Sequence, residues 1–234
     1  MFDLTEELQG LVHLYRTRAD RRRGTVIAFV GVTSNCGVST CARAFARQVA
    51  PNSTKGVWLF DLDFYANQQY AMFSTPQASR LYGPVGEPLD PTLQMEPFWQ
   101  VSPQLVREDG REVSSAWYLA VHQIGQHRLF VSRFRSEALQ DGQSVHVKRA
   151  AAYWQKMRDA IDLAVVDVPA RDRSRTILAL APDVDGVVLL AEHGSDPNAL
   201  IALQQEIEAS GGTCIGVVYN SIHAIPGAPQ QIQQ

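Results

Sequence analysis

Residues 25–40 read Thr25-Val26-Ile27-Ala28-Phe29-Val30-Gly31-Val32-Thr33-Ser34-Asn35-Cys36-Gly37-Val38-Ser39-Thr40. The first six residues are almost wholly apolar, which is typical of a strand buried on both faces of a parallel sheet. A loop of mostly small residues follows, and apolar residues then recur at helical spacing over residues 39–49. This stretch therefore predicts a strand, a tight loop and a helix in direct succession.

Similar apolar runs recur along the chain, and helical patterns separate several of them. The further runs occupy residues 57–61, 128–132, 163–167, 186–191 and 214–219, and the further helical patterns occupy about 147–161 and 197–209. Buried strands that alternate with helices predict an α/β fold, with a doubly wound, mostly parallel sheet flanked by helices.

The composition sets limits on the class of protein. Of the 234 residues, 45% are apolar and 19% are charged, and no apolar run approaches the roughly 18 residues that a membrane span needs. Lys and Arg number 21 against 24 Asp and Glu, so the net charge of −3 disfavours a nucleic-acid partner. The first residues lack the basic and apolar segments of a secretory signal, and we expect a cytoplasmic protein.

The sequence divides into three parts. In residues 1–23 we expect an amphipathic helix (about 4–18) and a basic linker. Residues 24–221 are expected to form the α/β domain, and residues 222–234 a disordered, Gln-rich tail. Residues 76–103 hold six of the 12 prolines, which predicts a long surface excursion without regular structure.

The loop after the first strand lies where phosphate-binding loops occur, because backbone N–H groups at a helix N-terminus attract anions. The general pattern is G-x-x-x-x-G-K-[ST]. Gly37 and Ser39 fit it, but Val38 stands at the position of the lysine, and Gly31 precedes Gly37 by six residues instead of five. A glycine and a serine also fit an ordinary turn and helix cap. The candidate nucleotide-binding residues here are Gly31, Gly37, Val38, Ser39 and Thr40.

Carboxylates follow two of the other predicted strands. Asp61 and Asp63 end one strand, and Asp167 ends another. In a doubly wound sheet ligands bind beyond the carboxyl ends of the strands, so all three acids are expected to face the loop. Hydroxyl and carboxylate oxygens suit Mg²⁺, which makes Ser39, Asp61 and Asp63 candidate ligands. The alternative is that these aspartates only cap turns or helices.

Five motifs in order resemble those of the bacterial tyrosine kinase family. These are cytoplasmic ATPase-like modules that work with polysaccharide co-polymerases, and they are related to the MinD and ParA ATPases. The resemblance covers about residues 24–221. The motifs are Gly31-Val32-Thr33-Ser34-Asn35-Cys36-Gly37-Val38-Ser39 (the Walker A loop), Leu59-Phe60-Asp61-Leu62-Asp63, Val165-Val166-Asp167-Val168-Pro169 (the Walker B strand), Leu180-Ala181-Pro182-Asp183-Val184-Asp185-Gly186-Val187-Val188-Leu189, and Ile215-Gly216-Val217-Val218-Tyr219-Asn220.

The resemblance implies a P-loop NTPase fold that binds ATP or ADP with Mg²⁺. It implies that Asp61 and Asp167 are the catalytic carboxylates, with Asp167 behind the attacking water or hydroxyl, and that Asn220 contacts the adenine.

The sequence also departs from the family pattern. Val38 replaces the Walker A lysine, Tyr65 replaces the arginine after D-x-D, and Thr176 replaces an aspartate. No tyrosine follows Tyr219, so the family's C-terminal tyrosine cluster is missing, and the N-terminal E-x-x-R-x-x-R motif lacks both arginines. These changes predict a degenerate member with weak or no catalysis. Arg43 and Arg47 are expected to face solvent or a carboxylate instead of replacing the lysine.

The first functional hypothesis is a non-catalytic or weakly catalytic, nucleotide-responsive adaptor in exopolysaccharide or capsule synthesis and export. Its partner would be the cytoplasmic ends of a polysaccharide co-polymerase, which would bring the protein to the inner face of the cell membrane. The sequence leaves open whether the protein forms a homo-oligomer. The alternatives are an active MinD/ParA-type ATPase that positions a membrane machine, and a structural interaction module without nucleotide.

Overall fold

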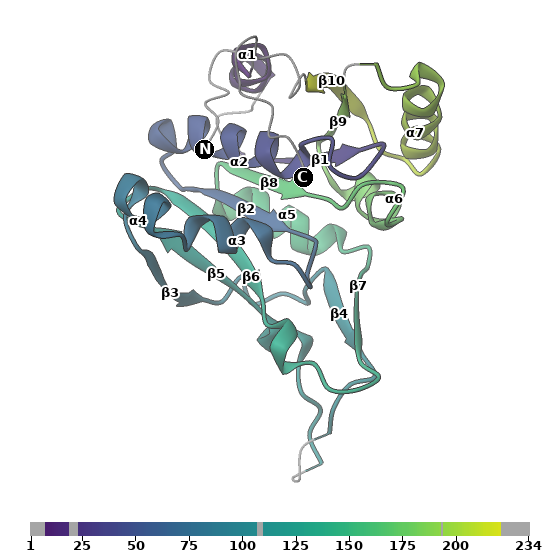
Figure 1. Ribbon diagram of the computed structural model, residues 1–234. Coiled ribbons are helices and arrows are strands. Elements are labelled where there is room, and N and C mark those ends of the chain that lie inside the picture. The colour runs from purple at the N-terminus through teal and green to yellow at the C-terminus, as the bar shows by residue number, and fades with distance from the viewer. Residues whose placement is uncertain (1–7, 19–22, 107–109, 193, 221–234) are drawn as a thin grey trace, which may run out of the picture.

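The computed structural model describes residues 8–18, 23–106, 110–192 and 194–220. The predicted tail, the start of the N-terminal helix and most of the basic linker lie outside these residues. The described chain forms an eight-stranded sheet of order β10-β9-β1-β8-β2-β6-β5-β3 and a two-stranded sheet of β4 and β7 (Figure 1).

The central part of the large sheet is parallel. Its strands are β1 (Thr25–Gly31), β2 (Val57–Asp61), β6 (Leu129–Phe134), β8 (Leu163–Asp167), β9 (Gly186–Glu192) and β10 (Cys214–Asn220). Each of these strands coincides with an apolar run that the sequence predicted. The sequence did not predict β5 (Leu119–Ile124) and β3 (Val85–Leu89), which extend one edge through antiparallel pairs.

Helices cover both faces of the sheet, as the fold class requires. One face packs against α1 (Gln9–Arg18), α2 (Val38–Val49) and α3 (Gln68–Phe73), and the other against α5 (Ala151–Ala160), α6 (Thr176–Leu180) and α7 (Pro197–Ala209). The remaining elements are α4 (Pro76–Tyr82), β4 (Trp99–Ser102), β7 (Ser144–Val147) and the short 3-10 helices Ala50–Asn52, Ser115–Tyr118, Ser136–Ala138 and Ala181–Asp183. The predicted α/β, doubly wound, mostly parallel fold is therefore confirmed.

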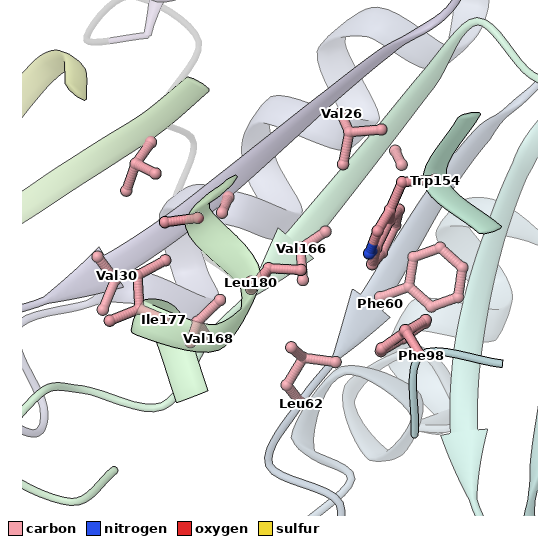
Figure 2. Close-up of a cluster of buried hydrophobic side chains, with 14 of the residues drawn as sticks. Val26, Val30, Phe60, Leu62, Phe98, Trp154, Val166, Val168, Ile177 and Leu180 are labelled. Atoms are coloured by element: carbon pink, nitrogen blue, oxygen red, sulfur yellow. The ribbon is translucent and has the colours of Figure 1, made fainter. Parts of the chain in front are cut away.

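The larger apolar core lies between the sheet and the second group of helices. Alternate residues of the parallel strands point into it, because successive side chains of a strand face opposite sides. Figure 2 shows side chains of the parallel strands, or of the residues just after them, against α5, α6 and the residue before β4. They are Val26, Val30, Phe60, Leu62, Val166 and Val168, then Trp154 of α5, Ile177 and Leu180 of α6, and Phe98. This core holds the carboxyl ends of β1, β2 and β8 in fixed positions.

The prediction that residues 76–103 lack regular structure is wrong. Pro76 occupies the first turn of α4, where a missing N–H costs nothing, and Thr75 caps that helix through Ala78 N. Pro88 lies in β3, an edge strand that pairs only with β5. Trp99 begins β4 and is fully buried, so it anchors the segment to the body of the protein.

The predicted bounds agree with the structure for α7 but not for α5. α7 has the predicted bounds, since Asp196 caps it by accepting a hydrogen bond from Asn198 N at 2.9 Å. α5 begins later than predicted because Ser144–Val147 pairs with β4 as strand β7. No helix in the described part of the chain combines the length and the apolar character needed to cross a membrane.

Candidate functional site

The strand order brings the predicted site residues together. β8 lies between β1 and β2, so Asp167 is paired in register with Phe29 on one side and Asp61 on the other. A pocket of about 250 Å³ opens at these strand ends. Its lining residues are Thr33, Ser34, Asn35, Gly37, Val38, Ser39, Thr40, Asp61, Asp63, Gln68, Asp167, Val168, Pro169, Ala170 and Arg173.

The loop between β1 and α2 presents a helix N-terminus to this pocket. Gly37 is the N-cap residue with φ of 91°, a left-handed conformation that favours glycine, and no side chain of the described residues caps the helix. The first helical bond runs from Cys41 N to Gly37 O at 3.0 Å, which leaves the N–H groups of Val38, Ser39 and Thr40 without helical partners. Such a terminus is suited to bind an anion.

Two residues close the base of the loop. A Cβ atom at Gly31 would lie 2.2 Å from Cys36 Sγ, so the loop can fold back over this position only because it is glycine. Val38 is 8% exposed and belongs to the apolar cluster that contains Cys36. Val38 therefore places an uncharged, apolar side chain where the general pattern has a lysine.

Asp61 and Asp167 are buried side by side, and both accept hydrogen bonds from Gln69, one from its backbone and one from its side chain. Asp61 Oδ2 accepts a hydrogen bond from Gln69 N at 2.9 Å, and Asp167 Oδ2 accepts one from Gln69 Nε2 at 2.6 Å. Burial, and then the charge of Asp167, raises the pKa of Asp61 to about 7. Burial also raises the pKa of Asp167, although hydrogen bonds from Gln69 and Ser39 oppose that shift. Two carboxylates in this state can exchange a proton for a cation.

Arg43 lies beneath this pair and was not predicted to be part of the site. The residue is 7% exposed, and its Nη1 donates to Gln69 Oε1 at 2.8 Å. The positive charge of Arg43 lowers the pKa of Asp167, against the larger effect of burial. Arg43 thus balances the buried carboxylates from inside the protein, and it does not line the pocket.

The rim of the pocket is closed by two polar contacts from the segment after β8. Arg173 NH1 lies 2.9 Å from Asp63 Oδ2. Asp172 accepts hydrogen bonds from Ser34 N and Ser34 Oγ, both at 2.9 Å. These contacts connect the segment to the end of β2 and to the top of the loop.

Asn220 reaches the loop but not the pocket. Its Nδ2 donates to Cys36 O at 3.0 Å, so the side chain fixes the loop backbone from the end of β10. The role at an adenine that the resemblance implied for Asn220 stays a prediction.

The predicted Mg²⁺ ligands lie in one pocket, but they do not form a metal cage. Ser39, Asp61 and Asp63 all line the pocket. Within the described residues, no group of three or more His, Cys, Asp or Glu side chains is arranged to hold a metal ion. Mg²⁺ commonly binds through one or two carboxylates together with phosphate oxygens, and the donors present fit that mode.

We expect Gln69→Leu to lower the free energy of unfolding by about 2–3 kcal/mol, because it removes the side-chain amide that hydrogen-bonds both Arg43 and Asp167 while the two charged groups stay buried. Urea denaturation measures this effect. Gln68→Leu is the matched control, since Gln68 is exposed on the same helix. Equal losses in the two variants would contradict the role of the buried amide.

Comparison with known proteins gives a structural likeness only. No protein-family model and no curated protein matches the sequence. Among solved structures, the VpsO kinase domain superposes with a TM-score of 0.53 at 13% identity, covering 92% of this chain and 93% of that one. The chimerical protein CapA2B2 gives 0.56 at 14% identity, covering 90% and 80%. The kinase domain of Escherichia coli tyrosine kinase ETK gives 0.50 at 14% identity, covering 94% and 76%. The chain therefore has the fold of bacterial tyrosine kinase domains.

Proposed function

We propose that this protein binds ADP or ATP together with Mg²⁺ and turns it over slowly or not at all. The observation that carries the proposal is the uncapped N-terminus of α2, which faces two strand-end carboxylates across one pocket. The backbone N–H groups of Val38, Ser39 and Thr40 would hold phosphate oxygens. Asp61, Asp63 and the Ser39 hydroxyl would hold Mg²⁺, which supplies the positive charge that a triphosphate needs in an acidic pocket.

Weak turnover follows from the residue at position 38. A phosphoryl group gains negative charge on its outer oxygens during transfer, and a lysine in the loop would stabilise that charge. The side chain of Val38 is apolar and buried. Loss of one preorganised donor of this kind lowers the rate by about 10²–10³-fold.

We further propose that nucleotide occupancy serves as a signal in exopolysaccharide or capsule synthesis or export. In this hypothesis the protein acts in the cytoplasm at the inner face of the cell membrane and binds the cytoplasmic ends of a polysaccharide co-polymerase. The support is the motif resemblance together with the tyrosine kinase fold. A strain that lacks the gene should produce less surface polysaccharide, and an unchanged yield would contradict this role.

Calorimetric titration of Mg-ADP and Mg-ATP into the purified protein tests the binding. We expect a dissociation constant near or below about 100 µM, since an occupancy signal requires binding at cellular nucleotide levels. Ser39→Ala is the informative variant because it removes one hydroxyl ligand and adds no bulk, and it should weaken the binding of the Mg²⁺ complex more than that of ADP alone.

This titration and an assay of phosphate release from Mg-ATP together distinguish the functional hypotheses. Binding without phosphate release supports the nucleotide-responsive adaptor. Binding with steady phosphate release would favour the MinD/ParA-type ATPase. Absence of binding at millimolar nucleotide would overturn both and leave a structural interaction module.

A further inference from the structure

The pocket is acidic for a site that would take an anion. Its described lining holds three carboxylates, those of Asp61, Asp63 and Asp167, and Arg173 is the one cationic side chain among these lining residues. A di- or triphosphate entering this pocket would meet one positive side chain, and that side chain does not come from the loop.

We propose that Arg173 is the residue that binds the nucleotide phosphates, in the role that the loop lysine has in the general pattern. This inference rests on the proposed nucleotide binding and adds a specific ligand to it. The guanidinium would contact the β-phosphate of ADP, and Asp63 would be released toward Mg²⁺.

The backbone of Arg173 is held in place near the loop. Arg171 N donates to Gly31 O at 2.9 Å, which attaches the segment after β8 to the first residue of the loop. A turn follows, in which Arg173 N donates to Ala170 O at 2.9 Å. Asp172, the residue before Arg173, is bonded to Ser34 at the top of the loop. The base of the Arg173 side chain therefore has a fixed position at the pocket rim.

The Arg173 side chain itself is free to exchange partners. It is 55% exposed, and its contact in the pocket is the single carboxylate of Asp63. Solvent at the arginine screens the ion pair, although the Asp63 side chain is only 17% exposed, so a phosphate with higher charge can displace the carboxylate. The planar guanidinium donates two parallel hydrogen bonds to phosphate, which gives it both affinity and geometry for this ligand.

Four other cationic side chains have different partners. Arg43 is buried under Gln69, and the guanidinium of Arg47 stacks at 4.4 Å over the ring of Tyr82. Lys55 Nζ donates to Asp159 O at the opposite end of the sheet. Arg171 Nε lies 2.7 Å from Glu206 Oε2 on α7. None of these four side chains belongs to the pocket lining.

The test compares Arg173→Gln, Arg173→Lys and the matched control Arg171→Gln, each titrated with Mg-ADP and with AMP. We expect Arg173→Gln to weaken ADP binding roughly ten- to a hundredfold while AMP binding changes little, because a charged hydrogen bond to the second phosphate is lost. Arg173→Lys should recover part of the ADP affinity, and Arg171→Gln should behave like the wild type.

The outcomes separate this inference from the function on which it rests. If the wild type binds Mg-ADP and Arg173→Gln binds it equally well, the assignment of Arg173 is wrong and nucleotide binding stands. If Arg173→Gln weakens ADP and AMP to the same extent, its effect is structural and the assignment is again wrong. If the wild type binds no nucleotide, the proposed function fails and the assignment fails with it.

Discussion

Asp61→Asn is expected to reduce the loss of stability between acid and neutral pH, and to stabilise the protein above about pH 7. In the folded protein burial raises the pKa of Asp61 from 3.8 to about 7. Between these two values the folded state holds a proton that the unfolded chain has released, so the free energy of unfolding falls as the pH rises. The full loss above pH 7 corresponds to about 4 kcal/mol at 1.36 kcal/mol per pKa unit.

Asparagine keeps the volume of Asp61 and carries no titrating proton. Urea denaturation of the wild type and the variant at about pH 5 and about pH 8 measures the difference. Asp172→Asn is the control of the same chemical type, because backbone and side-chain hydrogen bonds from Ser34 lower the pKa of Asp172, and its titration has the opposite sign. If the wild type and Asp61→Asn lose equal stability between the two pH values, Asp61 is not the group responsible.

Val38→Lys is expected to raise the rate of ATP hydrolysis by about 10²–10³-fold, and to tighten the binding of Mg-ATP, because it supplies the preorganised cation that the loop lacks. Val38 lines the pocket and is the first residue of α2. A lysine stem can lie along the same apolar surface and place its ammonium in the pocket. Phosphate release at saturating Mg-ATP measures the rate.

Val38→Met is the matched control, since it adds length without charge and should leave hydrolysis at the wild-type level. The change from valine to lysine removes some buried contact, and the loss of unfolding free energy should remain near 1 kcal/mol. If the lysine variant binds Mg-ATP more tightly but stays inactive, the other departures, at Tyr65 and Thr176, account for the missing turnover. If neither binding nor hydrolysis changes, the loop is not a phosphate site.

Several features of the fold could be predicted from local sequence alone. Parallel strands buried on both faces leave near-continuous apolar runs, so all six strands of the central sheet were recognised. α7 was placed correctly because its cap residue Asp196 directly precedes a proline and a helical pattern. β5 directly follows the aromatic residues Trp117 and Tyr118, and its apolar residues were not read as a separate strand. Its neighbour β3 was missed because it contains a proline.

The candidate site was predicted in part. The sequence indicated the loop, Asp61, Asp63 and Asp167 because each follows an apolar run, and the structure places them in one pocket. Gln69, Arg43 and Arg173 were not found as site residues. Gln69 and Arg43 act through contacts across 26 to 98 positions of chain, and no local pattern records such contacts. Arg173 was overlooked because it is one of several arginines in a short turn, and no sequence motif distinguishes it from them.

The sequence by itself determined the six parallel strands, their alternation with helices and the acids at the strand ends, because these depend on the periodicity of neighbouring side chains. The order of the strands was decided only in the tertiary structure. β8 enters the sheet between β1 and β2, although it follows β2 by about a hundred residues of chain. That insertion makes Asp167 the neighbour of Asp61 and of the loop, buries both carboxylates together and raises their pKa values. Burial and proximity are properties of the packed sheet, since a charge is desolvated only by the residues that surround it in space.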